Sequence, residues 1–180
     1  MNNIIKFTMI TLALALPCSA SAGDIKPYIG SGIGTYIIGN GTAGNGDYVV
    51  GGYASIGLEI SPYLAYELRA GTTAQANNSI SSFGTDFFVS YLIKPQYMLQ
   101  GFNVYALLGA STIKSWSQDI GKTKITKTNT SFSFGGGVET SVTDQFTLGV
   151  EAMILDNRRG FNPYSGNFTG AATGNLRYLF

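Results

Sequence analysis

Histidine is absent from this 180-residue chain, and cysteine occurs once, at Cys18. Without histidine the chain can assemble neither a Ser-His-Asp triad nor a histidine-based zinc site. A single cysteine cannot form an intrachain disulfide, so no disulfide framework supports the fold. The glycine-rich runs lack the strand-to-helix context of a phosphate-binding loop. We therefore expect a protein that is not an enzyme, with no catalytic residues and no cofactor or metal site.

Charge is also scarce, because charged residues make up 12% of the chain, against about 25% in ordinary soluble domains. Glycine (24 residues) and aromatic residues (13%) are abundant instead. After residue 22 no apolar run reaches the length of a membrane-spanning helix. Without Lys6, basic and acidic residues balance, so nucleic acid is not an expected partner. Low charge without an apolar helix favours a β-sheet membrane protein.

The N-terminus has the pattern of a secretory signal peptide. Lys6 precedes an apolar run from Phe7 to Leu16, and Ala20-Ser21-Ala22 follows as a cleavage site. The pattern predicts cleavage after Ala22 and export, with residues 1–22 removed and residues 23–180 forming one domain. Cys18 raises a lipoprotein alternative, but Pro17 fits a lipidation box poorly.

The rest of the chain alternates between apolar and polar residues with a period of two. In the last segment Leu176, Tyr178 and Phe180 share one face, and Asn175 and Arg177 share the other. This is the pattern of a strand with lipid on one side and a lumen on the other. Eight such segments are found, at about 26–38, 48–60, 63–74, 83–97, 103–116, 130–140, 146–154 and 168–180. The sequence thus predicts an all-β fold, an eight-stranded antiparallel up-and-down transmembrane β-barrel.

The connections between these segments alternate in length. Those after the second, fourth and sixth segments are short, and the others are long, as in barrels with short periplasmic turns and longer external loops. Both termini are then expected on the periplasmic side. Pro95 is expected near a strand end, at a bulge or at the membrane interface. Segment 103–116 is apolar on both faces, and its sides stay unassigned.

A soluble β-sandwich or lipocalin-like barrel would alternate in the same way. Such a fold needs a charged exterior, and the polar face of each segment carries only one or two charges among Gly, Ser and Thr. The membrane barrel is therefore the favoured interpretation.

Nine charged residues are expected to face the lumen: Lys26, Glu59, Glu67, Arg69, Asp86, Lys94, Glu139, Glu151 and Arg177. In an interior only wide enough for side chains, these charges should pair and hydrogen-bond. One interpretation is a polar core that sets the register and blocks flow. The alternative is a gated conduit with these residues as a filter.

Two external features stand out. The connection between the fifth and sixth segments carries Lys114, Lys122, Lys124 and Lys127 and is predicted to extend the strands as a hairpin. This basic surface could contact a host glycan or partner, or the phosphates of lipopolysaccharide. Aromatic residues near the segment ends suit an interfacial girdle: Tyr48, Tyr63, Tyr97, Trp116, Tyr164 and Phe180.

Several motifs resemble small bacterial outer-membrane barrels, namely the OmpA-like transmembrane domains with the opacity and OmpX/Ail-type proteins. The motifs that carry this resemblance are the signal peptide, the glycine-rich opening 27–34, the Tyr66-Glu67-Leu68-Arg69 strand and the Gly135–Glu139 strand. The resemblance implies residence in the outer membrane of a Gram-negative bacterium, among its lipid and lipopolysaccharide. It also implies that Tyr178 and Phe180 belong to the signal read by the outer-membrane assembly machinery.

Members of that group serve in envelope integrity, adhesion or serum resistance, and a few are small channels. The expected function is therefore a structural or surface-interaction role through the extracellular loops. The alternative is a small gated channel for ions or small apolar solutes.

Overall fold

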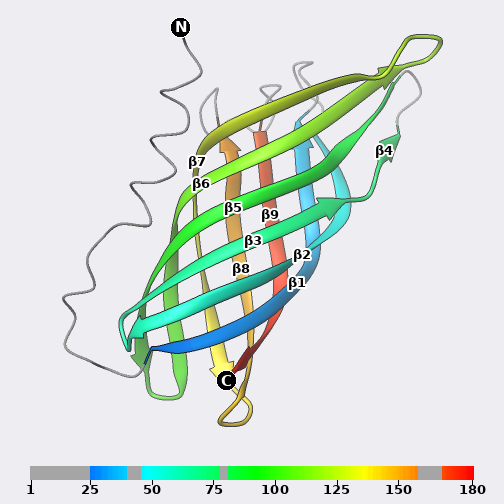
Figure 1. Ribbon diagram of the computed structural model, residues 1–180. Coiled ribbons are helices and arrows are strands. Elements are labelled where there is room, and N and C mark those ends of the chain that lie inside the picture. Colours follow the sequence, from blue (N-terminus) through cyan, green and yellow to red (C-terminus); the bar gives the residue numbers. More distant parts are fainter. Residues whose placement is uncertain (1–24, 40–45, 78–80, 158–167) are drawn as a thin grey trace, which may run out of the picture.

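The chain folds into a barrel of eight tilted antiparallel strands (Figure 1). This is a computed structural model, and it describes residues 25–39, 46–77, 81–157 and 168–180. The predicted signal peptide falls outside these residues and stays a prediction, as does the placement of Tyr164. The strands are β1 (Lys26–Gly39), β2 (Gly46–Ser61), β3 (Leu64–Thr73), β4 (Ala76–Asn77), β5 (Ser81–Leu99), β6 (Phe102–Asp119), β7 (Ile125–Ser141), β8 (Phe146–Asn157) and β9 (Phe168–Leu179).

The sheet closes on itself. Its order is β3, β2, β1, β9, β8, β7, β6, β5, and β5 pairs with β3 to complete the ring. The two-residue β4 continues β3 beyond a break and pairs with β5, so the two together make one of the eight barrel strands. None of the described residues forms a helix with the length and hydropathy needed to cross a bilayer. The predicted fold class is confirmed.

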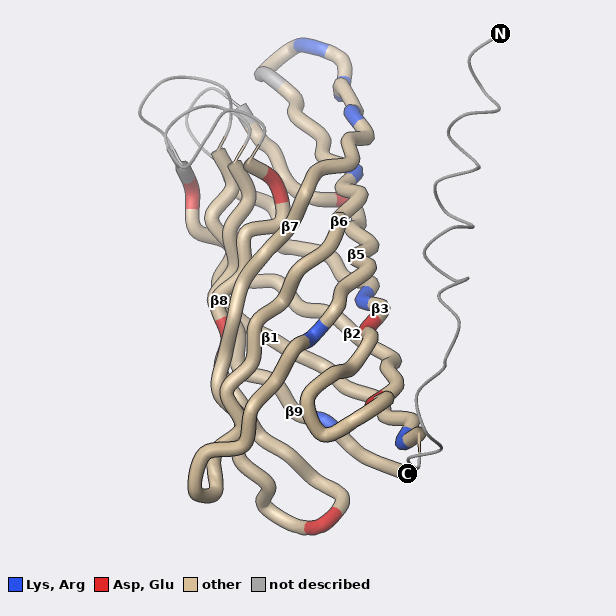
Figure 2. The backbone as a smooth tube through the Cα atoms, turned by 90° about the vertical axis from the view of Figure 1, so that its left-hand side faces the viewer, with Lys and Arg blue, Asp and Glu red and all other residues tan. Residues whose placement is uncertain are grey.

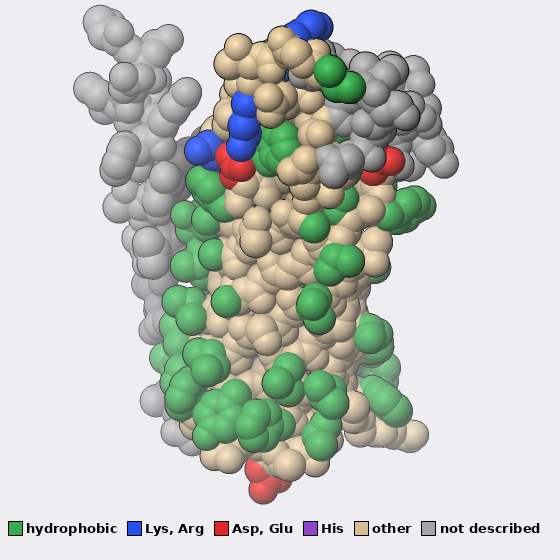
Figure 3. All heavy atoms as spheres, turned by 90° about the vertical axis from the view of Figure 1, so that its right-hand side faces the viewer, with side chains coloured by type: hydrophobic (Ala, Val, Ile, Leu, Met, Phe, Trp, Pro, Cys, Tyr) green, Lys and Arg blue, Asp and Glu red, His purple; other side chains and the backbone are tan. Residues whose placement is uncertain are grey.

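The strands form because apolar side chains point outward and polar or aromatic ones point inward. Ile29, Ile33 and Ile56 are exposed on the wall, whereas Tyr28, Tyr53 and other inward residues are buried. Apolar side chains lie along the wall on the face that Figure 3 shows. The exposed apolar residues of the strands include Ile29, Ile33, Val50, Ile56, Leu58, Leu68, Tyr91, Ile93, Leu108, Phe132, Val138, Leu148, Val150 and Leu176. A soluble barrel would bury this set, so its exposure fits a hydrocarbon solvent.

The two ends of the barrel differ. At one end, which we call the turn end, short connections join β2 to β3, β5 to β6 and β7 to β8. The C-terminus lies at this end (Figure 1). At the other, the loop end, β6 and β7 extend as a long hairpin around Gly121, a glycine with φ of 75°. By these bounds the connections after β1, β6 and β8 are longer than those at the turn end, as predicted, whereas the connection between β4 and β5 spans only residues 78–80 and is not.

Pro95 lies inside β5, four residues before the strand ends. On the β6 side the paired residues run from Ile93–Leu108 to Gln96–Tyr105 without a change of register, and Pro95 has no partner there. Of the alternatives predicted for Pro95, the bulge is therefore wrong, whereas its position near the strand end agrees with the prediction. The strand survives because Pro95 still aligns with Leu64 of β3, and the Gln96 amide donates to the Tyr63 carbonyl at 2.9 Å.

Glycines make room for the large inward side chains. The Tyr28 ring lies against Gly57 of the neighbouring strand, where a methyl group would overlap the ring. The Tyr53 ring lies against Gly32 in the same way. Because the glycines leave a gap on the inner wall, an eight-stranded ring can hold several tyrosines without expanding.

The interior divides into two halves of different chemistry. The half toward the turn end is charged and hydrogen-bonded, and the half toward the loop end is mainly apolar, although Ser90, Ser111 and Asp156 are also buried there. The apolar half is formed by buried side chains that include Tyr36, Ile38, Val49, Phe83, Phe88, Leu92, Leu107, Ile113, Met153 and Leu155. The predicted polar core thus describes only one half of the interior. This division also settles segment 103–116, where Leu107 and Ile113 point inward and Val104 and Leu108 outward.

Candidate functional site

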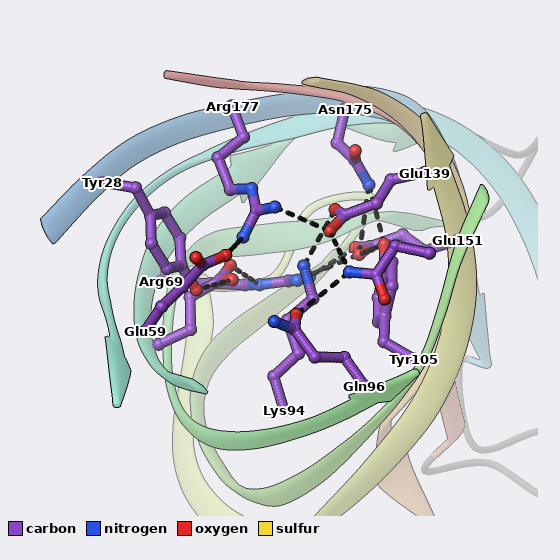
Figure 4. A network of polar contacts seen from close by, with 12 residues as sticks. Tyr28, Glu59, Arg69, Lys94, Gln96, Tyr105, Glu139, Glu151, Asn175 and Arg177 are labelled. Carbon is purple, nitrogen blue, oxygen red and sulfur yellow. Dashed lines mark hydrogen bonds and ion pairs between the residues drawn. The ribbon is translucent and has the colours of Figure 1, made fainter. Parts of the chain in front are cut away.

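Arg69 and Glu151 form the centre of the charged half, and they come from strands on opposite sides of the ring, β3 and β8. The Arg69 guanidinium donates to both carboxylate oxygens of Glu151, with 2.9 Å between Nη2 and Oε2. Its Nε donates to Oε1 of Glu67 at 2.6 Å. Both Arg69 and Glu151 are buried, at 3% and 7% exposure. One guanidinium therefore holds two carboxylates across the barrel (Figure 4).

Hydroxyl and amide donors complete the coordination of these carboxylates. Glu151 accepts from the Tyr53 hydroxyl at 3.0 Å and the Tyr105 hydroxyl at 2.9 Å. It also accepts from Thr173 at 3.2 Å and Asn175 at 3.3 Å. A buried carboxylate with this many donors keeps its charge without solvent, because each lone pair has a partner.

Glu139 on β7 is a second centre, nearer the turn end. It accepts from Lys94 Nζ at 2.9 Å, from Arg177 at 2.8 Å and from the Asn103 amide at 2.8 Å. Arg177 also donates to Glu59 at 2.6 Å, which links β9 to β2. Glu139 thus joins cations from β5 and β9 and closes the network on the remaining side of the ring (Figure 4).

Each of the three cations lies over the ring of a tyrosine. Arg69 is 4.4 Å from the Tyr53 ring centre, Lys94 is 3.9 Å from that of Tyr105, and Arg177 is 4.8 Å from that of Tyr28. Such contacts stabilise a cation that has left water. The tyrosine hydroxyls meanwhile donate to the carboxylates, as that of Tyr28 does to Glu67 at 2.7 Å.

Little open space remains inside the network. The cavity among its side chains measures about 10 Å³, which is room for about one water. Beyond Arg177 a vestibule of about 440 Å³ opens at the turn end, lined by Lys26, Glu59 and Gln96 among others. Among the described residues no group of three or more His, Cys, Asp or Glu side chains could hold a metal ion. The arrangement is suited to bracing the barrel.

The predicted basic loop is the hairpin of β6 and β7, which we call the basic hairpin (residues 114–127). It extends beyond the barrel at the loop end, and basic residues follow one another along it (Figure 2). Lys122 lies at its tip and Lys127 on its returning strand. Lys114 and Lys124 fold back onto the wall, where both pair with Asp86, at 3.9 and 3.2 Å.

Residues 8–177 match the family described as outer membrane protein beta-barrel domain. The chain belongs to this family. It is thus an outer-membrane barrel, with its short turns toward the periplasm and its long loops outside the cell.

Solved structures agree on the fold of this outer-membrane barrel. One is Ail, the attachment invasion locus protein of Yersinia pestis, in complex with the heparin analogue sucrose octasulfate; the two share 15% identity over 88% of this chain and 100% of that one, with a TM-score of 0.62. Neisserial surface protein A shares 11% identity over 89% and 100%, with a TM-score of 0.63. The N-terminal β-barrel domain of Pseudomonas aeruginosa OprF shares 11% over 86% and 97%, with a TM-score of 0.61. At these identities the likeness is one of fold. No curated protein sequence matches the chain.

Aromatic residues of the outer-membrane barrel gather near its periplasmic end. Tyr63 and Tyr97 stack at 6.3 Å between ring centres. Tyr178 makes edge contacts with Phe146 at 5.0 Å and with Phe180 at 5.2 Å. The Phe180 amide donates to the Pro27 carbonyl at 3.1 Å, which ties the C-terminus to the start of β1. Tyr178 and Phe180 therefore have a structural place at the seam of the barrel, and their role as an assembly signal stays a prediction.

Of the nine residues predicted to face the lumen, one lies at its periplasmic rim and one lies on the outer wall. Lys26 is exposed at the periplasmic rim, because it is the first residue of β1, and there it lines the vestibule. Asp86 lies on the outer wall between Lys114 and Lys124, because a β-bulge between Thr85 and Phe87 changes the alternation of β5. The other seven meet in the interior as described above.

The tyrosines are the part of the network that sequence reasoning missed. Tyr28, Tyr53 and Tyr105 supply hydroxyl donors to the carboxylates and rings to the cations. Their inward position follows from strand parity alone, since Tyr28 and Tyr53 share the parity of neighbouring inward polar residues. Which charge each tyrosine contacts depends on the register between strands that are far apart in sequence, and the sequence of one strand does not reveal that register.

Proposed function

We propose that this protein acts on the cell surface, in adhesion or envelope integrity, through its extracellular loops, and that it has no catalytic role. One observation carries the proposal: the described side chains of the barrel interior leave little open space beyond the vestibule. The charged half leaves about 10 Å³, and in the apolar half above it Leu107, Met153 and Leu155 are at most 5% exposed. A filled barrel is a rigid platform, so what differs between such proteins is what they present outside.

The basic hairpin is the part of the described chain best placed for contact. It extends from the barrel, carries Lys122 and Lys127, and exposes Ile120 at 77%. Ail, which has the same fold, was solved with a sulfated heparin analogue. That precedent supports an anionic surface ligand for the basic hairpin, because lysines on an extended hairpin offer charge complementarity to sulfate groups.

A retention assay tests this function. Cells that display the barrel are incubated with labelled heparin, which serves as the polyanionic probe, and retention is measured against salt. The Lys122→Gln/Lys127→Gln variant should retain several-fold less than the wild type. Lys26→Gln removes a charge at the periplasmic rim and should retain as much as the wild type. If the wild type retains no probe, and exchange of residues 119–125 for a short turn leaves binding to host cells unchanged, the surface role is wrong.

A channel remains the second candidate, and the vestibule is what favours it. Its 440 Å³ opens from the periplasm directly onto Arg177 and Glu139, so rearrangement of the network would lengthen the open path. Single-channel recording in planar bilayers distinguishes the two functions. Stable open events in the wild type that Arg69→Ala abolishes would replace the surface role with a gated channel.

A further inference from the structure

A cluster of charged and aromatic side chains lies on the outer wall, apart from the interior network. We call it the wall cluster, and it consists of Asp86 and Phe87 on β5, Lys114 and Trp116 on β6, and Lys124. Lys124 Nζ is 3.2 Å from the Asp86 carboxylate and 4.4 Å from the Trp116 ring centre. Lys114 Nζ is 3.9 Å from Asp86 and 5.8 Å from the Phe87 ring centre. Two ammonium groups therefore converge on one carboxylate.

A β-bulge in β5 places Asp86 on the outer wall. The bulge between Thr85 and Phe87 adds a residue to β5 where β3 breaks off. Thr72 holds the bulge, because its hydroxyl lies 3.1 Å from the Thr85 carbonyl and 3.0 Å from the Asp86 carbonyl. Bulges commonly re-aim a side chain at a functional position. Here the bulge puts a carboxylate on the lipid-facing side of the barrel, where a regular strand would put it inside.

The position of the wall cluster along the barrel axis determines which layer of the membrane it faces. Below it, on the same strands, the wall is apolar, with Tyr91 53% and Leu108 44% exposed. On β6 Lys114 lies six residues beyond Leu108 toward the loop end, and Lys124 pairs with the same Asp86, so both lysines stand above this apolar surface, toward the extracellular end. A side chain just above the hydrocarbon faces the headgroups of the outer leaflet. Aromatic rings combined with lysines are typical of that boundary.

The wall cluster carries an excess of positive charge that its own carboxylate does not cancel. Two lysines share Asp86, and their side chains keep 40% and 45% of their surface exposed. Each ammonium has three N–H groups to donate, and Asp86 cannot satisfy all of them. A phosphate monoester above the cluster would accept the remaining N–H groups, and charge-assisted bonds of this kind are strong.

We propose that the wall cluster is a binding site for the phosphorylated headgroup of a glycolipid in the outer leaflet, with Lys114 and Lys124 as the phosphate ligands. Trp116 and Phe87 supply the rings over which the two ammonium groups lie. Asp86 holds the two ammonium groups together when no lipid is bound. The site does not depend on the proposed surface function, since it faces the membrane and not the medium.

Lipid A binding to the mature protein in nanodiscs of zwitterionic phospholipid tests the site. A lysine near an anionic lipid surface contributes about 1 kcal/mol, which is about fivefold in affinity. Lys114→Gln and Lys124→Gln should each weaken lipid A binding by about fivefold or more. Lys122→Gln removes an equal charge at the hairpin tip and should change binding much less. Equal effects of all three substitutions would mean diffuse attraction and would overturn the site.

Asp86→Asn distinguishes lysines that bind the lipid phosphate from lysines that only pair with Asp86. If the cluster holds phosphate, loss of the carboxylate removes a repulsion and lipid A should bind more tightly. If the lysines serve only to pair with Asp86, the same substitution should leave binding unchanged or weaken it, which would contradict the proposal. Heat-modifiable gel migration of each variant shows that the barrel is folded.

Two further arms identify the source of the phosphate. Lipid A from which both phosphates have been removed should bind as weakly to the wild type as intact lipid A binds to Lys114→Gln. Inorganic phosphate at millimolar concentration should not compete, because it lacks the acyl chains that place the headgroup at the wall. Effective competition by inorganic phosphate, or equal binding of the dephosphorylated lipid, would exclude a glycolipid headgroup site.

Discussion

The Arg69 guanidinium and the Glu151 carboxylate meet across the full width of the barrel, with both oxygens of the acid accepting from one arginine. β3 and β8 are four places apart in a ring of eight strands, so no two strands are farther apart. A buried pair of this kind is costly to break, because removal of one partner leaves the other charged and without water.

Glu151→Gln should therefore destabilise the barrel strongly. Loss of the carboxylate leaves Arg69 with Glu67 alone and deprives two tyrosine hydroxyls of a charged acceptor. We expect a loss of about 3–5 kcal/mol in the free energy of unfolding, measured by urea titration in lipid vesicles. Glu59→Gln is the matched control, because Glu59 is half-buried and Arg177 retains Glu139, so its loss should be smaller. Equal losses would argue against a centre at Glu151.

The packing of Tyr28 against Gly57 gives a second prediction. A methyl group at position 57 would overlap the tyrosine ring, which is buried and cannot move aside. Gly57→Ala should lower the free energy of unfolding by about 1–3 kcal/mol, the usual range for overpacking. Gly174→Ala is the control, since the Gly149 carbonyl oxygen, the nearest atom that a methyl group would meet beyond the adjoining residues, is 4.0 Å away. An unchanged free energy of unfolding in Gly57→Ala would show that the Tyr28 ring has room to shift, which contradicts this close packing.

Conductance should depend on both halves of the interior. The Arg69→Ala/Glu151→Ala variant removes the central pair of the charged half, but Leu107 and Met153 still close the apolar half above it. We expect this variant to stay at the baseline current in planar bilayers. Adding Leu107→Ala and Met153→Ala should produce open events. Open events in the first variant alone would mean that the apolar half does not block ions.

The C-terminal aromatic residues should matter more for assembly than for stability. Phe180 is 67% exposed and contacts one neighbouring ring, that of Tyr178. Phe180→Ala should reduce the amount of folded barrel in the outer membrane of cells, and it should leave refolding into vesicles nearly unchanged. Phe102→Ala, at a similarly exposed aromatic on a different strand, controls for general loss of the girdle. Equal defects in both variants and both assays would remove the special role of the terminus.

Strand parity explains how much of this barrel the sequence could predict. An alternation such as Leu176-Arg177-Tyr178 is a local property of the chain, so the faces of most strands follow from it. The same parity brought seven of the charged residues into the interior. It failed at Asp86, where the bulge inserts a residue into β5. A bulge depends on the break in the neighbouring strand, and parity within one strand does not record it.

The apolar half of the interior was missed for a different reason. Leu107 and Ile113 lie on the inner face of a strand whose outer face is also apolar, so alternation gives no signal there. The partners of the network likewise depend on contacts between strands far apart in sequence. Tyr53 meets Glu151 only because closure of the ring brings β2 and β8 to the same height.

The position of the network in the ring also bears on the order of folding. β1 to β3 supply Tyr28, Tyr53, Glu67 and Arg69, and β7 to β9 supply Glu139, Glu151 and Arg177. An open sheet that contains the early strands alone holds Arg69 without its main acid. Late strands alone hold Glu151 without its cation. Each group of strands therefore carries charges without their partners until β1 pairs with β9. This last pairing to form is also the step that neutralises the interior and makes closure of the barrel hard to reverse.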